Sequence, residues 1–431
     1  MTAIPLSSTS RSRRTATPDA VIVGGGLAGS GLAITLRRLG MEVALIERTR
    51  EFHDRIRGET IHPWGAREIR ELGLEDVAID AAGALPQRHW LTYRDRQPGT
   101  PYTWADDFPD APYGLSVRHS VFQRALLDAA IAEGVRVFRP AEVRLSRTGS
   151  RVTASIESGG ERLELRPRFV FGADGQGSAT RSWIGGSARR DPVHHAIGGA
   201  LIDGLDLADD RVHQAFFGGG FAMITPQTGG TSRVYLICSS EEASRIQRAP
   251  NSATPFMERV AEGLPDGVVG EWRNTGPIGF FPNANVVATY PAIPDVIPIG
   301  DAAGANDPCQ GHGISLTFRD VRVVRDLFRD SVEDGEISGA FAAKRRAYFE
   351  VLRQHARWTE RQATESGPEI EAIRERIARA RELDPTAGGF TGIFATGPDG
   401  LVADEAARRH FLGEDLPLEP ASRVAELMSA D

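Results

Sequence analysis

One glycine-rich turn near the start of the chain constrains the fold more than any other feature. A short β-branched run, Ala20–Val23, leads into the turn, and helical periodicity begins at Leu27 and ends at Gly40. A second apolar run, Met41–Ile46, follows with the character of a strand. A strand, a helix and a second strand in this order predict a βαβ unit of the dinucleotide-binding type.

The residue types of this turn suit the pyrophosphate of a dinucleotide. Glycines let the backbone approach it closely, and the free N–H groups of the following helix N-terminus attract its charge. Glu47 lies close to the spacing, about 20 positions after the glycines, that places a carboxylate on the adenosine ribose. The cofactor contacts expected from this segment are Gly24, Gly26, Leu27, Ala28, Gly29, Glu47 and Arg48.

Two further turns, each with an aspartate next to a glycine, lie far downstream. Asp174 follows the apolar run Phe169–Phe171, and Asp301 follows Ile297–Gly300. A single glycine fingerprint would be a weak signal, whereas three such segments in this order are specific. Together they predict that the chain binds FAD.

The composition limits the class of protein. A chain of 431 residues with 41% hydrophobic and 25% charged residues can form two packed domains. The net charge of −8 argues against general binding to nucleic acid, and no apolar run is long enough to span a membrane. Cys238 and Cys309 form no metal or disulfide pattern, so we expect no metal site and a cytoplasmic location.

The remaining patterns predict an α/β protein with a discontinuous Rossmann-like FAD-binding domain. The polar, basic N-terminal stretch has no apolar segment, which predicts a disordered tail rather than a signal peptide. Short strand-like runs dominate the middle of the chain, with one helix expected around 253–263, and residues 386–431 have no clear pattern. The predicted divisions are 1–18 as the tail, 19–189 with 286–330 as the FAD-binding domain, 190–285 as an interleaved β-rich substrate domain, and 331–431 as a C-terminal helical segment.

With these motifs in place, residues 19–365 resemble the para-hydroxybenzoate hydroxylase family of FAD-dependent monooxygenases. Arg57, soon after the ribose acid, is similar to the family's flavin-contacting arginine. Arg118 matches a position that reaches the FAD phosphates, and the backbone near Val143 matches a strand that meets the adenine. In the same resemblance Asp174 belongs to a DG motif and Asp301 to a GD motif, whose acid binds a ribityl hydroxyl.

The third turn continues into a loop that the resemblance places beside the flavin ring. Backbone N–H groups at the start of the next helix would face the flavin N1–C2 edge, and the positive end of the helix would stabilise the reduced anion. Many relatives have glutamine and asparagine where this chain has His312 and Ser315. A histidine beside a flavin can titrate near neutral pH, so His312 and Arg57 are the candidate catalytic residues, with a loop-packing role as the alternative for His312. The cofactor contacts expected from this loop are Pro308, Gly311, Gly313 and Ile314.

The resemblance implies a monooxygenase with NAD(P)H as reductant and a small organic molecule as substrate. One oxygen atom of O2 would enter an aromatic or electron-rich compound through a flavin C4a-hydroperoxide, as in aromatic catabolism or secondary metabolism. The sequence has no separate nicotinamide fingerprint, which agrees with the transient binding of nicotinamide in that family. Phe221 and Met223 alternate along an apolar strand and are the candidate substrate-binding residues, with core packing as the alternative.

Three other functions share features with this chain. Halogenases of this architecture need a lysine between the first two motifs and a WxWxIP strand, whereas the only lysine here is Lys344 and the corresponding strand is Phe221–Pro226. Reductases of isoprenoid double bonds are the stronger alternative, because Arg57–Glu59 is similar to a segment of geranylgeranyl reductases. A flavoprotein sensor without turnover is the third, although no accessory sensor domain stands out.

Overall fold

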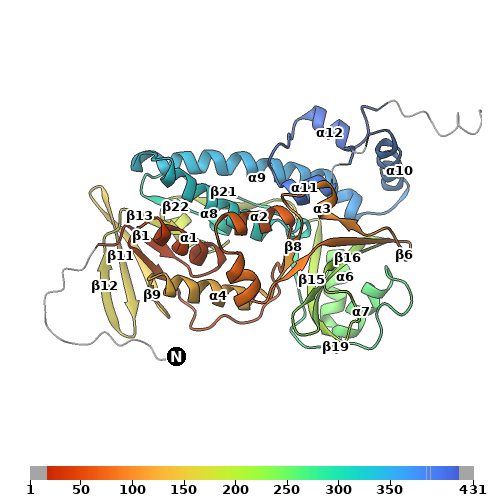
Figure 1. The fold of residues 1–431 in the computed structure, drawn as a ribbon, viewed down its shortest axis with the longest axis horizontal. Coiled ribbons are helices and arrows are strands. Elements are labelled where there is room, and N and C mark those ends of the chain that lie inside the picture. The colour runs from red at the N-terminus through yellow and green to blue at the C-terminus, as the bar shows by residue number, and fades with distance from the viewer. Residues whose placement is uncertain (1–16, 385, 389, 417–431) are drawn as a thin grey trace, which may run out of the picture.

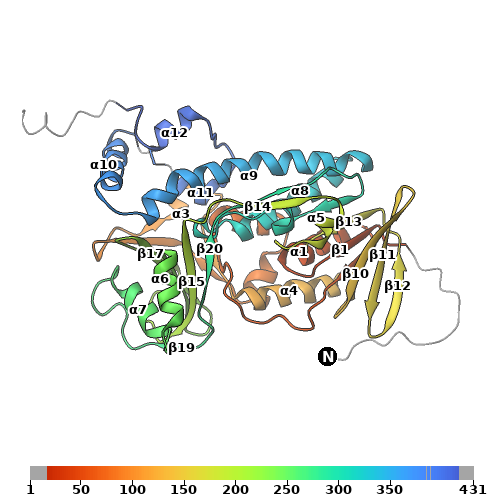
Figure 2. The same cartoon turned by 180° about the vertical axis from the view of Figure 1, so that it is seen from behind.

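The computed structural model describes residues 17–384, 386–388 and 390–416. Two sheets dominate the molecule, one in each half of its long axis, and the long helix α9 (Asp334–Thr364) extends across both (Figures 1 and 2). The predicted tail at 1–18 lies outside the described residues except for Thr17 and Pro18. Within the described ranges, no helix has both the length and the apolar character needed to cross a bilayer.

The first sheet is parallel throughout and is buried on both faces. Its five strands, in spatial order, are β22 (Val296–Pro298), β13 (Phe169–Gly172), β1 (Ala20–Val23), β2 (Val43–Ile46) and β9 (Arg136–Phe138). Ile22 packs on one face against helices, and Val21 packs on the other face against a small antiparallel sheet. Strands covered on both faces need continuous apolar runs, which is why the sequence signal for them was clear.

Helices cover one face of the parallel sheet and three strands cover the other. The helices are α1 (Leu27–Arg38), α4 (His119–Ala132) and α8 (Gly313–Arg329). The strands are β10 (Glu142–Thr148), β11 (Arg151–Ser158) and β12 (Glu161–Leu165). The α/β class predicted from the sequence is confirmed by this parallel sheet and its covering helices.

The second sheet has nine strands and carries the central part of the chain. Its main path is β19 (Arg273–Asn274), β15 (His195–Asp203), β18 (Thr231–Cys238), β17 (Gly220–Gln227), β16 (Arg211–Phe217), β5 (His89–Arg94) and β6 (Gln97–Pro98). β20 (Gly279–Asn283) pairs with β15, and β7 (Tyr102–Thr103) pairs with β5. Residues 89–103 lie within the predicted FAD-binding segment 19–189, whereas in the structure β5 pairs in parallel with β16 of the nine-stranded sheet.

Two helices cover the outer face of the nine-stranded sheet. They are α6 (Ser240–Arg248) and α7 (Ala253–Ala261), and the sequence predicted only the second. Ala222 and Ile224 of β17 face these helices, and Phe221 and Met223 therefore face the other way. This inner face is the one that meets the rest of the molecule.

Short elements connect the two sheets, and helices complete the C-terminal part. The connecting strands are β14 (Ser187–Arg190) with β21 (Val286–Thr289), and β3 (Thr60–Ile61), β8 (Gly114–Ser116) and β4 (Leu85–Gln87). The short helices are α2 (Pro63–Glu71), η1 (Val77–Ala81), α3 (Trp104–Asp107), α5 (Ala179–Trp183), η2 (Gly300–Ala303) and η3 (Pro308–Gln310). After α9 come α10 (Pro368–Leu383), α11 (Phe390–Thr396) and α12 (Glu405–Phe411).

Candidate active site

The glycine-rich turn is packed directly against the second motif. Gly24 has a φ of +106°, and a Cβ atom placed on it would lie 2.4 Å from the carbonyl oxygen of Ala173. A Cβ atom on Gly29 would lie 1.8 Å from the carbonyl oxygen of Gly24. Side chains at either position would separate the first two motifs or unwind the start of α1, so both glycines are structural requirements.

The N-terminus of α1 has the properties of an anion site. Gly26 is its N-cap residue, and no side chain among the described residues caps it. The first N–H groups of the helix, beginning at Leu27, thus lack an internal partner. Their free donors fit a pyrophosphate, which supplies both the charge and the acceptors that such a terminus lacks.

Glu47 is buried and braces the same turn. One carboxylate oxygen accepts a hydrogen bond from the backbone N–H of Gly25 at 2.7 Å. The other accepts from the backbone N–H and the hydroxyl of Thr49, at 2.7 and 2.6 Å. Beside it opens a cavity of about 480 Å³ lined by Arg48, the Pro140–Glu142 segment and the hairpin Glu157–Arg162. Val143, the predicted adenine contact, follows this lining directly on β10.

The GD loop, residues 300–304, is held by charged side chains from three helices. The backbone N–H of Gly300 donates to Asp320 at 2.8 Å, and Arg345 donates to the carbonyl of Gly304 at 2.8 Å. Arg181 of α5 donates to the carbonyl of Ala302 at 2.8 Å. Three backbone groups of the loop, at Gly300, Ala302 and Gly304, are therefore fixed from outside the motif.

Asp320 and Arg345 form a buried ion pair behind this loop. Their side chains are 0% and 3% exposed, and the Arg345 Nε atom lies 2.9 Å from the carboxylate. The hydroxyl of Tyr348 donates to the same carboxylate, and the guanidinium of Arg345 lies 4.7 Å from the ring centre of Phe349. Sequence reasoning missed this support, because its members lie 20 to 48 positions after Gly300 and match no motif.

Asp301 and Arg57 lie close enough for the charge of the arginine to act on the carboxylate. Asp301 keeps part of its surface exposed, and Arg57 is exposed. Desolvation raises the pKa of Asp301, while the positive charge of Arg57 and a hydrogen bond from Gln176 oppose that shift. Arg181 also donates to the carbonyl of Gln176 at 2.7 Å, which connects the GD loop to the DG turn.

The DG aspartate itself has a local structural role. The carboxylate of Asp174 accepts hydrogen bonds from the hydroxyl of Ser178 at 2.5 Å and from the backbone N–H of Thr180 at 2.9 Å. These contacts fix the start of α5, and α5 carries the Arg181 that holds the GD loop. Asp174 therefore acts on the site through the first turn of α5, whose N-cap residue is Ser178.

His312 is a buried side chain in this structure. It is 1% exposed, and its Nδ1 atom accepts a hydrogen bond from Trp64 at 3.3 Å. Burial lowers the pKa of His312 well below its ordinary value, and the nearby imidazoles of His62 and His355 lower it further. This burial favours the loop-packing alternative for His312, because a ring enclosed by aromatic side chains loses the solvation that a charge requires.

The helix that follows His312 begins without a side-chain cap among the described residues. Gly313 has open space around its Cα, and Ile314 and Ser315 are buried behind it. Pro308 opens the short helix η3, and Gly311 has a φ of +69° that carries the chain into α8. The first N–H groups of α8 therefore lack partners within the helix, which leaves them available to an acceptor outside it.

Arg118 is at the N-cap of α4, where its guanidinium donates to Asp54 at 2.7 Å. Asp54 also contacts Arg233, which is fully buried and bonded to the fully buried Glu59 at 2.5 Å. Gln227 donates to Glu59 at 2.8 Å. This polar network ties β17 and β18 to the segment around Arg57, and nothing local in the sequence indicated it.

The inner face of the nine-stranded sheet supplies an apolar surface next to these groups. Phe221 and Tyr235 belong to one apolar cluster, against which Cys309 packs from the loop 308–312, called the flavin-edge loop after its predicted contact. Met223 lies directly opposite Tyr235 on the neighbouring strand. The hydroxyl of Tyr235 donates to the backbone carbonyl of Arg57 at 2.7 Å. The candidate substrate-binding residues and the candidate flavin-contacting arginine therefore meet at Tyr235.

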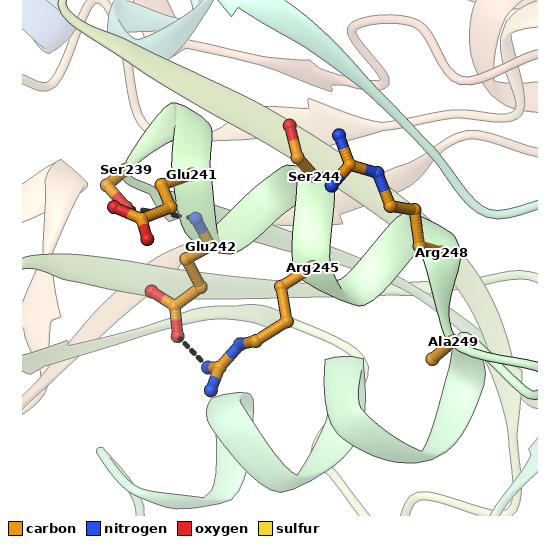
Figure 3. A pocket seen from close by; sticks show the side chains of 7 residues that line it. All are labelled: Ser239, Glu241, Glu242, Ser244, Arg245, Arg248 and Ala249. Atoms are coloured by element: carbon orange, nitrogen blue, oxygen red, sulfur yellow. Dashed lines mark hydrogen bonds and ion pairs between the residues drawn. The ribbon is translucent and has the colours of Figure 1, made fainter.

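A larger cavity, of about 690 Å³, lies elsewhere. Figure 3 shows its lining, which comes from α6 and its flanks and includes an ion pair between Glu242 and Arg245 at 3.3 Å. Ala243 and Ile246 of the same helix pack on the outer face of the nine-stranded sheet. This cavity contains none of the predicted site residues and is on the opposite face from Phe221 and Met223.

The sequence matches the FAD binding domain family over residues 17–328. The chain belongs to this family. FAD is accordingly its cofactor, and the predicted resemblance to FAD-dependent monooxygenases is confirmed at the level of family and fold.

Two kinds of enzyme stand out among the relatives. Squalene monooxygenase of Rattus norvegicus is 26% identical over 359 residues, which cover 79% of this chain and 59% of that protein. A digeranylgeranylglycerophospholipid reductase of Methanosarcina mazei is 24% identical over 332 residues, which cover 74% of this chain and 77% of that protein. This chain therefore spans less than two thirds of the length of the squalene monooxygenase.

Solved structures agree on the fold. The p-nitrophenol 4-monooxygenase PnpA of Pseudomonas putida DLL-E4 has a TM-score of 0.71 at 19% identity, over 92% of this chain and 96% of that chain. The flavin-dependent halogenase CmlS has a TM-score of 0.70 at 19% identity, over 96% of this chain and 78% of that chain. Because one fold serves both chemistries, the reaction has to be argued from the site.

Proposed function

We propose that this protein is an FAD-dependent monooxygenase that inserts one oxygen atom into an aromatic or electron-rich small molecule, with NAD(P)H as reductant. The observation that carries the proposal is the hydrogen bond from Tyr235 to the Arg57 carbonyl. It joins the apolar face that includes Phe221 and Met223 to the segment beside Asp301. An apolar wall next to a flavin-contacting segment is what oxygen transfer to an organic substrate requires.

The residues of the first two motifs would hold the adenosine half of FAD. The free N–H groups from Leu27 to Gly29 suit the pyrophosphate, and the remaining acceptor capacity of Glu47 suits a ribose hydroxyl. The cavity between Arg48 and the β11–β12 hairpin lies where Val143 would meet the adenine. Arg118, already paired with Asp54, would approach the phosphates from the start of α4.

The residues of the third motif would hold the flavin half. Asp301 would accept a hydrogen bond from a ribityl hydroxyl, and Pro308, Gly311, Gly313 and Ile314 would form the edge beside the ring. The bound cofactor, once reduced, activates dioxygen. The positive end of α8 would favour negative charge at that edge, and exposed Arg57 would position the ring and the substrate.

The apolar face would exclude water during the reaction. Phe221 is 4% exposed and lies in a cluster with Ile197 and Tyr235, so packing holds its ring in place. Met223 is only partly buried and bridges this cluster to the aromatic cluster around Trp90. A dry, shaped wall protects an activated oxygen species from loss as peroxide.

The test begins with the absorbance of oxidised flavin in the purified protein. A panel of phenols, other arenes and alkenes is then screened for compounds that accelerate NAD(P)H oxidation. The proposal expects at least one such compound to be converted to a product that has gained one oxygen atom from isotope-labelled dioxygen. A product without label contradicts it.

A second candidate, reduction of an isoprenoid double bond, has one specific observation in its favour. This chain covers 77% of the digeranylgeranylglycerophospholipid reductase but only 59% of the squalene monooxygenase. A reductase would add two hydrogens to an alkene of the panel under anaerobic conditions with reduced flavin. The monooxygenase proposal expects no such product without oxygen.

A further inference from the structure

Phe394 of α11 lies where three separate parts of the molecule meet. Its ring stacks on His62, with centroids 4.0 Å apart and planes inclined by 12°. Its centroid is 5.4 Å from that of Trp90 and 5.7 Å from that of His312. His62 precedes α2, His312 precedes α8, and Trp90 belongs to β5 of the nine-stranded sheet.

These neighbours connect Phe394 to the candidate active site. His312 immediately precedes the uncapped start of α8, and His62 is bonded to the carbonyl of Gln310 at 2.9 Å. Met223, a candidate substrate-binding residue, packs against the same apolar cluster as Phe394. The C-terminal segment therefore reaches both the flavin-edge loop and the inner face of the sheet.

The cluster differs from an ordinary apolar core. The buried ring atoms His62 Nδ1 and His312 Nε2 have no hydrogen-bond partner among the described residues. Buried polar atoms without partners are costly, and a plain core would place aliphatic side chains there instead. Aromatic faces interspersed with a few convergent polar atoms are typical of a binding pocket for a flat organic ligand.

The segment is fixed to the FAD-binding part at its far end. Asp399 accepts two hydrogen bonds from Arg319 of α8, at 2.7 and 2.6 Å, and one from Arg67 of α2 at 3.1 Å. A Cβ atom on Gly397 would lie 2.5 Å from the ring of Trp64, so the backbone rests directly on that side chain. This anchor sets the position of Phe394 relative to α2 and α8.

We infer that Phe394 is a specificity-determining residue and that residues 393–399 form the third wall of the substrate site. The inference rests on the proposed function. The other walls are the flavin-edge loop and the inner face of the sheet that includes Phe221 and Met223. A phenyl ring fixed by ring stacking selects flat substrates of limited size, because a larger ring system would have to displace it.

The test uses the FAD-loaded protein and two C-terminal variants. Phe394→Ala removes the proposed wall, and Phe411→Ala removes an equally buried ring that packs away from it, 5.6 Å from Trp358. The probes are phenol, 1-naphthol and a tricyclic phenol, and their binding is followed by the perturbation of flavin absorbance. Phe394→Leu serves as the milder variant if the alanine variant does not fold.

We expect Phe394→Ala to shift the ratio of naphthol to phenol affinity by about tenfold or more, in favour of the larger ring. Phe411→Ala should leave that ratio unchanged although it lowers thermal stability. The inference is contradicted if Phe394→Ala and wild type have the same ratio of naphthol to phenol affinity. It is also contradicted if neither protein binds any of the probes. Oxygen labelling of the wild-type product tests the proposed function separately, since the binding measurement requires no turnover.

Discussion

The GD loop and the inner face of the nine-stranded sheet meet at the candidate active site, yet they are built in different ways. The loop is held by hydrogen bonds and ion pairs that come from Arg181, Asp320 and Arg345. The sheet face is apolar and aromatic, and Tyr235 connects it to the loop side. The cofactor side therefore depends on fixed polar geometry, whereas the substrate side depends on shape. Variants of the two sides should accordingly fail in different ways.

The largest effect is expected from Arg345→Met. It leaves the carboxylate of Asp320 buried without its charge partner, which should lower the free energy of unfolding by about 3–5 kcal/mol and weaken FAD binding. Urea unfolding and FAD titration of the apoprotein measure the two effects. Arg346→Met, at an exposed neighbouring position, should change stability by no more than about 0.5 kcal/mol. Equal behaviour of the two variants would show that the ion pair does not support the loop.

The second prediction concerns the pH dependence of stability and tests the burial of His62 among aromatic side chains. Burial lowers the pKa of His62 from 6.5 to about 4, partly opposed by its bond to Gln310. The unfolded chain binds this proton near pH 6.5, so the neutral ring contributes stability above that pH, and the contribution is lost as pH falls toward 4. One pKa unit corresponds to about 1.4 kcal/mol, so the loss should reach about 3 kcal/mol.

The comparison of wild type with His62→Gln isolates this contribution. Urea unfolding at a series of pH values should show that the wild-type protein loses about 3 kcal/mol more than the variant between pH 6.5 and 4. Parallel curves would mean that folding does not lower the pKa of His62.

A smaller effect is expected for Glu47→Ala. The variant removes the acceptor for Gly25 and Thr49, and for a ribose hydroxyl, so FAD affinity should fall by about 1–3 kcal/mol. Glu42→Ala is the matched control, because that carboxylate is exposed and pairs with Arg37 at the surface. An unchanged dissociation constant for FAD in Glu47→Ala would show that Glu47 does not bind a ribose hydroxyl.

The smallest effect, and the one that sharpens the comparison most, is expected for Tyr235→Phe. It removes only the hydroxyl that bonds the Arg57 carbonyl, at a cost of about 1 kcal/mol. FAD affinity should not change, while the fraction of NAD(P)H oxidation that ends as peroxide should rise. Tyr93→Phe is the control, since it removes an equivalent bond to His213, at 2.9 Å, within the cluster on the outer face. If the fraction of NAD(P)H oxidation that ends as peroxide is the same in both variants, the coupling through Arg57 is refuted.

The cofactor side could be predicted from the sequence because its signals are local. The strand Ala20–Val23, the glycine turn and the acid after the second strand all lie within 28 residues, so they can be recognised together as one local pattern. Asp174 and Asp301 were found because each follows a buried strand of the parallel sheet. Continuous apolar strands between turns leave few alternative folds.

The substrate side could be predicted only in part, because its contacts are non-local. The pairing of β5 with β16 joins segments about 120 residues apart, so the strands at 89–103 gave no indication of their sheet. The helix α6 has only two buried residues, Ala243 and Ile246, and a pattern this sparse does not stand out. The burial of His312 depends on Trp64 and Phe394, which lie 248 positions before it and 82 positions after it.

The most direct test of oxygen transfer is the fate of isotope-labelled dioxygen with wild-type protein, FAD, NAD(P)H and the first compound that accelerates NAD(P)H oxidation. Bromide is included to test for halogenation. Halogenases of this architecture need a lysine between the first two motifs, whereas the only lysine here, Lys344, lies on α9. The account predicts a product with one labelled oxygen atom and no halogen. A product that has gained two hydrogens without label, or one that contains bromine, would contradict it.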